Sequence, residues 1–172
     1  ITVTVLGNTG RGKAMLSRSA ARPGDKVAVT GYLGTAAAGW EMLTRRLQFD
    51  PEAAAQLKRA FLRPSPRIAE GQLLAQQGAK AAIDISDGLV SDLHQICKAS
   101  HTSARLEADR VPIMPEVKAN FGDRAIELAL SGGEDYELLF AGDADTIDKI
   151  EEAAACPVTI VGEVTAGEAG KI

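Results

Sequence analysis

Apolar residues recur along the chain with two periods, one of two residues and one of about 3.6 residues, which are typical of strands and helices respectively. The first period predicts strands at residues 1–7, 26–30, 80–86, 103–108, 136–141 and 158–164. The second predicts helices at residues 35–48, 52–62, 67–77, 88–99, 115–130 (with a break near 122–123) and 146–155. Because the two kinds of element alternate, we expect an α/β fold, a layered α+β sandwich in which helices flank a mixed sheet.

Prolines mark where several of these elements begin and end. Pro51 favours a helix start, and the two prolines of residues 63–67 (RPSPR) exclude a helix there and predict an extended corner. In the helix before Pro51, helical spacing puts Trp40, Leu43 and Leu47 on one face.

The two ends of the chain bear on its domain organisation. Residues 1–7 predict a strand without an initiator methionine, and residues 165–170 predict a turn that leads into a further strand at Lys171. We expect residues 1–25 to be the last strand of a preceding amino-terminal domain and a junction. Residues 26–172 would then form a carboxy-terminal domain that is truncated at its end.

Composition narrows the classes of function. The chain has 172 residues, 45% of them hydrophobic and 24% charged, which suits an ordinary globular domain. A net charge of -4 and only 4% aromatic residues disfavour nucleic acid as a partner. Cys97 and Cys156 lack neighbours at metal-ligand spacing, and Cys97 falls on the apolar face of its helix. No apolar run is long enough for a membrane span, so we expect a cytoplasmic protein.

Residues 7–13 (GNTGRGK) imitate a phosphate-binding P-loop, because they have its glycines and lysine and follow a predicted strand. The next residue is Ala14, however, which lacks the hydroxyl that such a loop offers to Mg²⁺, and Pro23 would end the helix behind it early. A flexible surface loop is the favoured interpretation of this segment.

The segment at residues 83–89 (IDISDGL) is the first candidate site. Strand alternation predicts Asp84 between apolar neighbours, where a carboxylate needs a partner. Asp87 and a helix start follow, which would bring two carboxylates and free backbone N–H groups together. Hard cations prefer carboxylate oxygens and phosphates prefer helix N-termini, so the segment suits a metal–nucleotide. Two alternatives stay open: Asp87 or Ser86 caps the helix, and Asp84 pairs with a buried arginine.

The second candidate site is the segment at residues 131–140 (SGGEDYELLF). Its paired glycines allow close approach to a ligand or a neighbouring element, and three acids follow them. Glu134 precedes the predicted strand, in which Asp135 and Glu137 share the face opposite to Tyr136. The alternative is a tight turn whose acids are solvated at a sheet margin.

Together with residues 18–25 (RSAARPGD), 29–31 (VTG) and 63–67, these segments closely resemble thiamine-monophosphate kinases in order and spacing. That family is related to aminoimidazole ribonucleotide synthetase, selenophosphate synthetase and a hydrogenase maturation factor. The resemblance implies the fold of the carboxy-terminal domain of aminoimidazole ribonucleotide synthetase. It also implies a homodimer in the full-length protein.

The resemblance further implies ATP-dependent phosphorylation of thiamine monophosphate to thiamine diphosphate, without a covalent nucleophile on the enzyme. By position in the motifs, Asp84 and Asp87 resemble Mg²⁺ ligands, and Arg18 and Ser86 resemble contacts to ATP. Glu134 resembles a contact to the thiamine phosphate substrate.

The chain departs from the family's pattern at two places. Ala20 stands where the family commonly has glycine, and the aromatic residue expected near the family's carboxy terminus is absent, which removes part of the substrate wall. Two other functions are weighed: another ATP-using synthetase of the same superfamily, or a noncatalytic dimerisation or interaction module, which the apparent lack of half an active site would suit. We expect the chain alone to show no appreciable kinase turnover, because most metal ligands of the family lie in the amino-terminal domain.

Overall fold

Strands and helices alternate through the computed structural model, which describes residues 2–4 and 15–172. The strands are β1 (Lys26–Thr30), β2 (Ala81–Ile85), β3 (Ser103–Leu106), β4 (Glu137–Gly142) and β5 (Val158–Thr165). The helices are α1 (Thr35–Arg45), α2 (Pro51–Leu62), α3 (Ile68–Gln77), α4 (Leu89–Ser100), α5 (Pro115–Phe121), α6 (Arg124–Ser131) and α7 (Ala144–Ala153), with a 3₁₀ helix η1 (Ala108–Arg110) after β3.

Most predicted elements are confirmed, and the exceptions lie at the amino terminus. Residues 2–4 have no strand structure, so the strand predicted at 1–7 is wrong for those three residues. The remainder of that strand and the P-loop-like segment at 7–14 lie outside the described residues. The predicted break between α5 and α6 is confirmed at Gly122, whose φ of 54° favours glycine.

The sheet has the strand order β2-β4-β1-β5-β3, and all four strand pairings are antiparallel. The layered α+β architecture is therefore confirmed, whereas the expected mixed sheet is corrected to an antiparallel one. Within residues 15–172, the parallel contact that occurs is an isolated bridge between Ser17 and Ala81. Period-two alternation is the same in parallel and antiparallel strands, so the pattern carried no information on strand direction.

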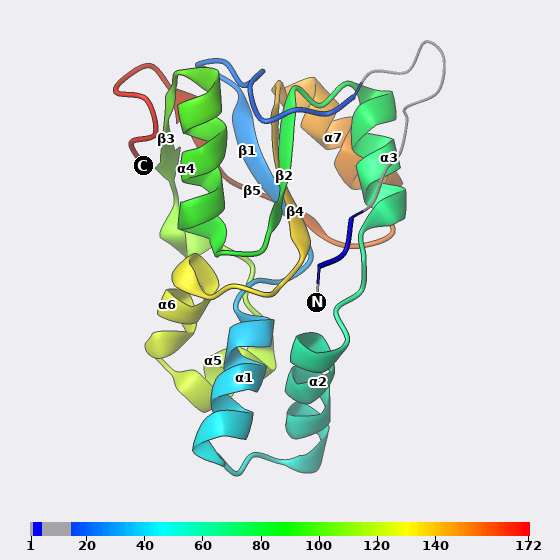
Figure 1. Cartoon of the computed structure of the whole chain (residues 1–172), viewed down its shortest axis with the longest axis vertical. Helices are drawn as coiled ribbons and strands as arrows, with labels where there is room; N and C mark the ends of the chain where they lie inside the picture. The colour runs from blue at the N-terminus through cyan, green and yellow to red at the C-terminus, as the bar shows by residue number, and fades with distance from the viewer. Residues whose placement is uncertain (1, 5–14) are drawn as a thin grey trace.

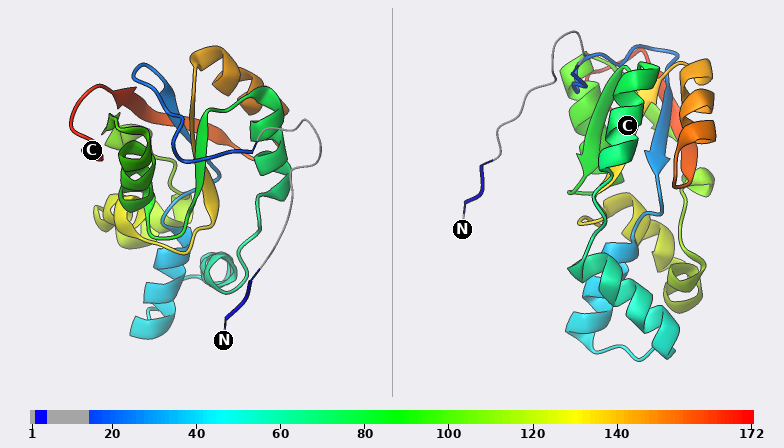
Figure 2. Two further views of the ribbon diagram at one scale, coloured as in Figure 1. Left: turned by 45° about the horizontal axis from the view of Figure 1, so that its top comes forward. Right: turned by 90° about the vertical axis from the view of Figure 1, so that its right-hand side faces the viewer.

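Helices cover both faces of the sheet (Figures 1 and 2). Val27, Val29 and Leu139 point to one face, where they pack in a core with residues of α4 and α6. Ala28 and Phe140 point to the other face and pack against α3 and α7. This division follows the alternation of side chains along β1 and β4. The α1–α2 pair and α5 extend beyond the lower end of the sheet in Figure 1.

The apolar stripe predicted on α1 lies at the surface. Trp40 is 50% exposed and Leu43 is 38% exposed, while Leu47, which is 37% exposed, lies beyond the end of the helix at Arg45. The buried face of α1 instead includes Ala38 and Gly39, which admit close packing. A Cβ at Gly39 would overlap with the backbone oxygen of Leu57 in α2, so this glycine sets the separation of the two helices.

The proline-rich corner at residues 63–67 is tied to the sheet by a charged network. Arg67 donates from Nε and Nη2 to the two carboxylate oxygens of Glu137, both at 2.6 Å. Glu137, which is 8% exposed, also accepts a hydrogen bond from Thr30 Oγ1 at 2.6 Å. This bidentate contact raises the pKa of Arg67 and joins β1, β4 and the α2–α3 connection.

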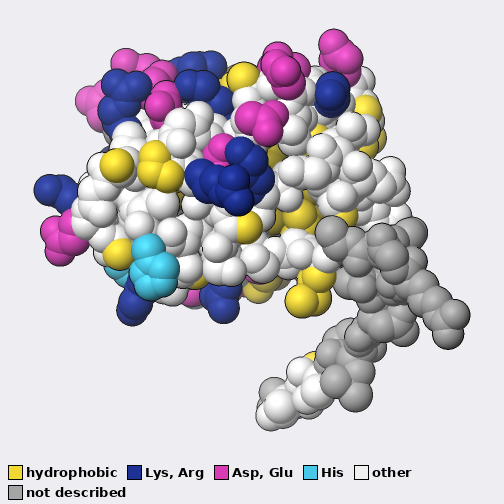
Figure 3. Space-filling model, turned by 90° about the horizontal axis from the view of Figure 1, so that it is seen from above, with side chains coloured by type: hydrophobic (Ala, Val, Ile, Leu, Met, Phe, Trp, Pro, Cys, Tyr) yellow, Lys and Arg dark blue, Asp and Glu magenta, His cyan; other side chains and the backbone are white. Residues whose placement is uncertain are grey.

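The face seen from above in Figure 3 carries acidic and basic side chains in small mixed groups. None of the helices in the described part of the chain is both long and apolar enough to cross a membrane. Cys97 is buried, as predicted, and burial raises the pKa of its thiol.

Candidate active site

The two candidate segments lie directly against each other. The Glu134 N–H donates to the Ser86 carbonyl at 3.0 Å, and the Tyr136 N–H donates to the Ile85 carbonyl at 2.9 Å. A Cβ at Gly133 would overlap with the Ser86 carbonyl oxygen, so only glycine allows this contact. The paired glycines were predicted to approach a ligand or a neighbouring element closely. Gly133 closely approaches a neighbouring element, the loop that contains Ser86. Residues far apart in sequence form one structural unit at the lower end of the sheet.

A buried acid fixes the loop between β2 and α4. Asp92, which is 2% exposed, accepts hydrogen bonds from the N–H groups of Ser86 and Asp87, both at 3.0 Å. Gly88 occupies the N-cap of α4 with a φ of 109°, and no side chain caps the helix. Capping therefore does not account for Asp87 or Ser86. The N–H groups of Ser86 and Asp87, which precede the helix, are thus already paired with Asp92.

Sequence reasoning missed Asp92, although a signal was present. The residue lies on the same helical face as Leu89, Leu93 and Ile96, which are all buried. An acid on an apolar face needs partners, and the loop N–H groups supply them. Burial raises the pKa of Asp92, the two backbone hydrogen bonds oppose the rise, and the nearby charges of Asp87 and Asp84 add to it.

Four of the predicted site residues line one open hollow of about 470 Å³: Arg18, Asp84, Ser86 and Asp87. The chain before β1 reaches this hollow because the Ser17 carbonyl accepts a hydrogen bond from the Ala82 N–H at 3.0 Å. The Arg18 carbonyl also accepts from Ser100 Oγ at 2.9 Å, which anchors the segment to α4.

The burial predicted for Asp84 is wrong. The residue is exposed, although Ala81 and Ile85 of the same edge strand are buried. No buried arginine partner is needed, and the structure shows no ion pair to Asp84 within residues 15–172. Its candidacy as a ligand therefore depends on its place beside Asp87 in the hollow.

The donor set of the hollow fits Mg²⁺ bound together with a nucleotide. Asp84 and Asp87 are both exposed and offer carboxylate oxygens, the donors that Mg²⁺ prefers. Protein-bound Mg²⁺ usually takes one or two carboxylates and completes its shell with water and substrate phosphates. Within the described part of the chain, no group of three or more His, Cys, Asp or Glu side chains is arranged to hold a metal alone.

Glu134 lies in a strained loop. Its φ is 71° and that of Tyr136 is 50°, values that residues other than glycine rarely adopt. The Tyr136 hydroxyl donates to Glu134 Oε2 at 3.1 Å, and this bond raises the pKa of the tyrosine. The strain also moves the start of β4 from the predicted residue 136 to Glu137. A strained backbone persists only where the surrounding contacts hold it in place. Strained residues of this kind are common at functional sites.

The other two acids of this segment have structural roles. Asp135 accepts hydrogen bonds from the N–H groups of Gly34 at 2.6 Å and Ala36 at 3.0 Å, at the start of α1. Glu137 belongs to the network with Arg67. The alternative of solvated acids at a sheet margin is therefore wrong for these two residues. Glu134 is the exposed acid of the three.

We expect the titration of Asp135 to make the protein less stable as the pH rises. Burial raises the pKa of Asp135 to about 6, whereas an unfolded aspartate titrates near ~3.9. Between these values the native state keeps a proton that the unfolded chain has lost. The contribution of Asp135 to the free energy of unfolding therefore falls from about pH 4 to about pH 6, then levels off.

Denaturant titrations of the unmodified chain and of Asp135→Asn across this pH range measure the effect. The difference in unfolding free energy between the two proteins should change in favour of the asparagine variant as the pH rises. A difference that is independent of pH would contradict the prediction.

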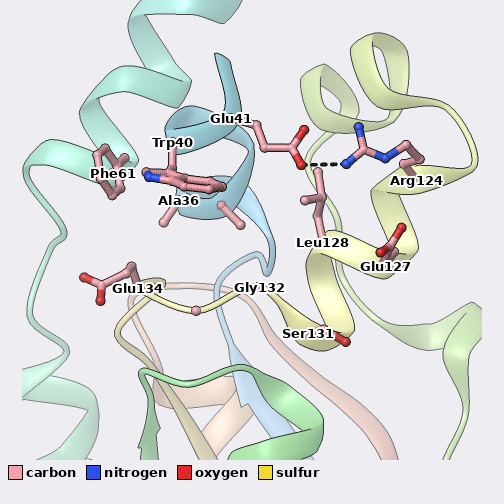
Figure 4. A pocket seen from close by; sticks show the side chains of 12 residues that line it. Ala36, Trp40, Glu41, Phe61, Arg124, Glu127, Leu128, Ser131, Gly132 and Glu134 are labelled. Carbon is pink, nitrogen blue, oxygen red and sulfur yellow. Dashed lines mark hydrogen bonds and ion pairs between the residues drawn. The ribbon is translucent and has the colours of Figure 1, made fainter. Parts of the chain in front are cut away.

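A second pocket, of about 610 Å³, lies on the other side of the glycine loop, between α1, α2 and α6. Figure 4 shows Trp40 and Phe61 on one side of it and Arg124 and Glu127 on the other, with Glu134 near the loop below. Sequence reasoning placed Glu134 at the site but missed the rest of this pocket. The sequence offered one signal, the apolar residues at helical spacing around Trp40. That spacing predicts a buried face, whereas the structure leaves Trp40 exposed.

Residues 22–172 match the family model described as AIR synthase related protein, C-terminal domain. The match covers most of the chain, including both candidate segments. The chain belongs to this family. The AIR synthase-related fold expected from the resemblance is thereby confirmed.

Among the relatives of this AIR synthase-related chain are thiamine-monophosphate kinases. It is 42% identical to the thiamine-monophosphate kinase of Salmonella typhimurium (strain LT2), over 96% of this chain and 52% of that protein. The crystal structure of thiamine-monophosphate kinase from Stenotrophomonas maltophilia K279a superposes with a TM-score of 0.85 at 36% identity, covering 93% of this chain and 53% of that one.

A structure of AaThiL complexed with AMPPCP and TMP superposes with a TM-score of 0.80 at 34% identity, covering 90% of this chain and 49% of that one. The resemblance to thiamine-monophosphate kinases is confirmed by these similarities. The chain spans about half the length of the relatives that it matches.

Proposed function

We propose that this chain is the carboxy-terminal part of an ATP-dependent thiamine-monophosphate kinase that makes thiamine diphosphate and ADP. In this proposal residues 1–25 end an amino-terminal domain and residues 26–172 form the domain that faces ATP and the substrate. The main support is that Arg18, Asp84, Ser86 and Asp87 line one hollow in a fold shared with such kinases. The AMPPCP and TMP bound to AaThiL support ATP and thiamine monophosphate as the substrates.

Each residue of the hollow has a role that fits phosphoryl transfer. Arg18 contacts the phosphates of ATP through its guanidinium, and Ser86 contacts them through its hydroxyl, since its N–H is paired with Asp92. Asp84 and Asp87 hold Mg²⁺, which when bound screens the phosphate charges and aligns them. Neither aspartate is assigned a proton transfer.

The reaction needs alignment more than a nucleophile from the protein. A phosphate oxygen of thiamine monophosphate forms the new P–O bond to the γ-phosphorus, while the bond to the β-phosphate oxygen breaks and ADP leaves. Glu134 contacts the substrate from the strained loop, and the hydrogen bond from Tyr136 orients its carboxylate. The contact between Glu134 N–H and Ser86 carbonyl keeps the substrate side in register with the nucleotide side.

The proposal includes a homodimer for the full-length protein and a cytoplasmic location. The resemblance to the family supports the dimer. Both cysteines are free, which suits a reducing compartment. Nucleic acid is not among the proposed partners, in line with the net charge of -4.

The decisive experiment replaces Asp84 in the full-length protein. We expect Asp84→Ala to lower kcat for thiamine monophosphate by about a hundredfold and to raise the Mg²⁺ concentration needed for half-maximal activity. Asp148→Ala is the matched control, because Asp148 is an exposed acid on α7 and should leave both values unchanged. If Asp84→Ala left turnover and Mg²⁺ dependence intact, the proposed role would be wrong.

Two measurements separate the alternatives. Assaying the full-length protein for ATP consumption with thiamine monophosphate and with other acceptors distinguishes the kinase from a related synthetase. Calorimetry of the 172-residue chain with Mg-ATP distinguishes a nucleotide-facing domain from a noncatalytic module, since micromolar binding contradicts the latter. We expect no appreciable turnover from the chain alone.

A further inference from the structure

Asp92 is a buried acid to which the proposed phosphoryl transfer gives no role. It is 2% exposed on α4, where its neighbours on the same face, Leu89, Leu93 and Ile96, are almost completely buried. A carboxylate in such surroundings is unfavourable unless hydrogen bonds offset its loss of water. Among the described residues, no cationic side chain forms an ion pair with Asp92. Packing alone therefore does not account for an acid at this position.

A single oxygen of Asp92 makes both hydrogen bonds to the loop between β2 and α4. Oδ2 accepts from the N–H groups of Ser86 and Asp87, both at 3.0 Å. These two N–H groups precede α4, which begins at Leu89, so the hydrogen bonds of the helix do not include them. Two successive peptide groups of the loop are thus fixed by one side-chain atom.

The backbone of Ser86 is also held from a second side. Its carbonyl accepts a hydrogen bond from the Glu134 N–H at 3.0 Å, so Asp92 fixes one end of the residue and the glycine loop fixes the other. Asp84 is fixed separately, because β2 pairs with β4 and places it opposite Leu138. The direction in which the side chains of Ser86 and Asp87 extend, relative to Asp84, therefore depends on Asp92.

We propose that Asp92 is a positioning residue for the hollow: it holds Ser86 and Asp87 where, together with Asp84, they receive Mg²⁺ and the phosphates of ATP. The inference rests on the proposed function, which gives those three residues their roles. Asp92 acts through the backbone of the loop and is assigned neither a metal bond nor a proton transfer. Residues that orient metal ligands in this way typically change metal affinity by about 10- to 100-fold when they are replaced.

Two replacements of Asp92 separate its hydrogen bonds from its charge. Asp92→Asn keeps an acceptor oxygen for the two N–H groups, whereas Asp92→Ala removes it. In the 172-residue chain, amide exchange at Ser86 and Asp87, followed by NMR, should accelerate by at least about tenfold in Asp92→Ala and by less than about threefold in Asp92→Asn. Ile96→Val is the matched control, because it removes a buried methyl group from the same helix and should leave both amides within about twofold.

Metal binding gives a readout that does not depend on turnover. Calorimetry of the full-length protein with AMPPCP measures the affinity for Mg²⁺, which should fall by at least about tenfold in Asp92→Ala and by less than about threefold in Asp92→Asn. Asp92→Glu keeps the charge but displaces the acceptor by one methylene, so it should resemble Asp92→Ala. Circular dichroism establishes that each variant is folded, and Asp92→Glu carries the test if Asp92→Ala does not fold. Equal weakening in Asp92→Asn and Asp92→Glu, or unchanged affinity in folded Asp92→Glu, would overturn the inference.

Kinetics of the full-length protein separate this inference from the proposed function. Asp92→Ala should raise the Mg²⁺ concentration needed for half-maximal activity by at least about tenfold, while KM for thiamine monophosphate stays within about threefold. An active kinase whose Mg²⁺ dependence is the same in Asp92→Ala would overturn the role of Asp92 alone. Absence of thiamine-monophosphate kinase activity, with amide exchange and Mg²⁺ affinity changing as expected, would overturn the proposed function alone.

Discussion

Arg67→Met should lower the free energy of unfolding by about 3 kcal/mol, because it leaves the carboxylate of Glu137 buried without its cationic partner. Glu137 is 8% exposed and receives two hydrogen bonds of 2.6 Å from the guanidinium. Equilibrium unfolding in urea measures the change. The proline-rich corner should also loosen from the sheet, which hydrogen exchange at the flanking N–H groups of Arg63 and Gly71 detects.

Two further variants test this interpretation. Arg67→Met combined with Glu137→Leu removes both charges and should recover most of the lost stability. Arg110→Met breaks an exposed ion pair with Glu107 of 3.5 Å and should cost less than about 0.5 kcal/mol. If the single and double replacements at Arg67 and Glu137 destabilised the protein equally, packing would explain the loss better than the buried charge.

Gly133→Ala should destabilise the protein by about 3 kcal/mol, because its Cβ would overlap with the Ser86 carbonyl oxygen and neither backbone can yield easily. The two loops would have to separate. In the full-length protein we therefore expect loss of turnover together with weaker binding of both ATP and thiamine monophosphate, measured by steady-state kinetics and calorimetry.

Gly71→Ala is the control for the added methyl group. Gly71 lies within α3, and the nearest atom to a Cβ there would be Leu138 Cδ1 at 3.8 Å. Alanine at this position should stabilise the protein by about 0.5–1 kcal/mol, because glycine is a poor helix former. Gly133→Ala with native stability and activity would show that the loops can separate at little cost.

Local elements were predictable because proline, glycine and capping residues mark their boundaries. The start of α2 at Pro51 and the end of α3 before Gly78 follow from such residues. The strand order was not predictable, because it depends on how helices pack across the sheet. That order makes β2 an edge strand, on which Asp84 is exposed whereas Ala81 and Ile85 are buried.

The candidate site, like the fold, was predictable in part. Arg18, Asp84, Ser86 and Asp87 were expected in one site, and they do line one hollow. The pocket with Trp40 was not foreseen, because an apolar stripe on a helix normally indicates a buried face.

Chain segments also run along both outer strands of the sheet. The Ser17 carbonyl accepts from the Ala82 N–H on β2, and the Lys171 carbonyl accepts from the Ala104 N–H on β3. Unpaired strand edges are sites where proteins aggregate by forming intermolecular sheets. Each of these contacts occupies a backbone donor that a second molecule would otherwise use. A backbone donor of each outer strand is thus already paired within the chain, including one on β2, the strand that contains Asp84.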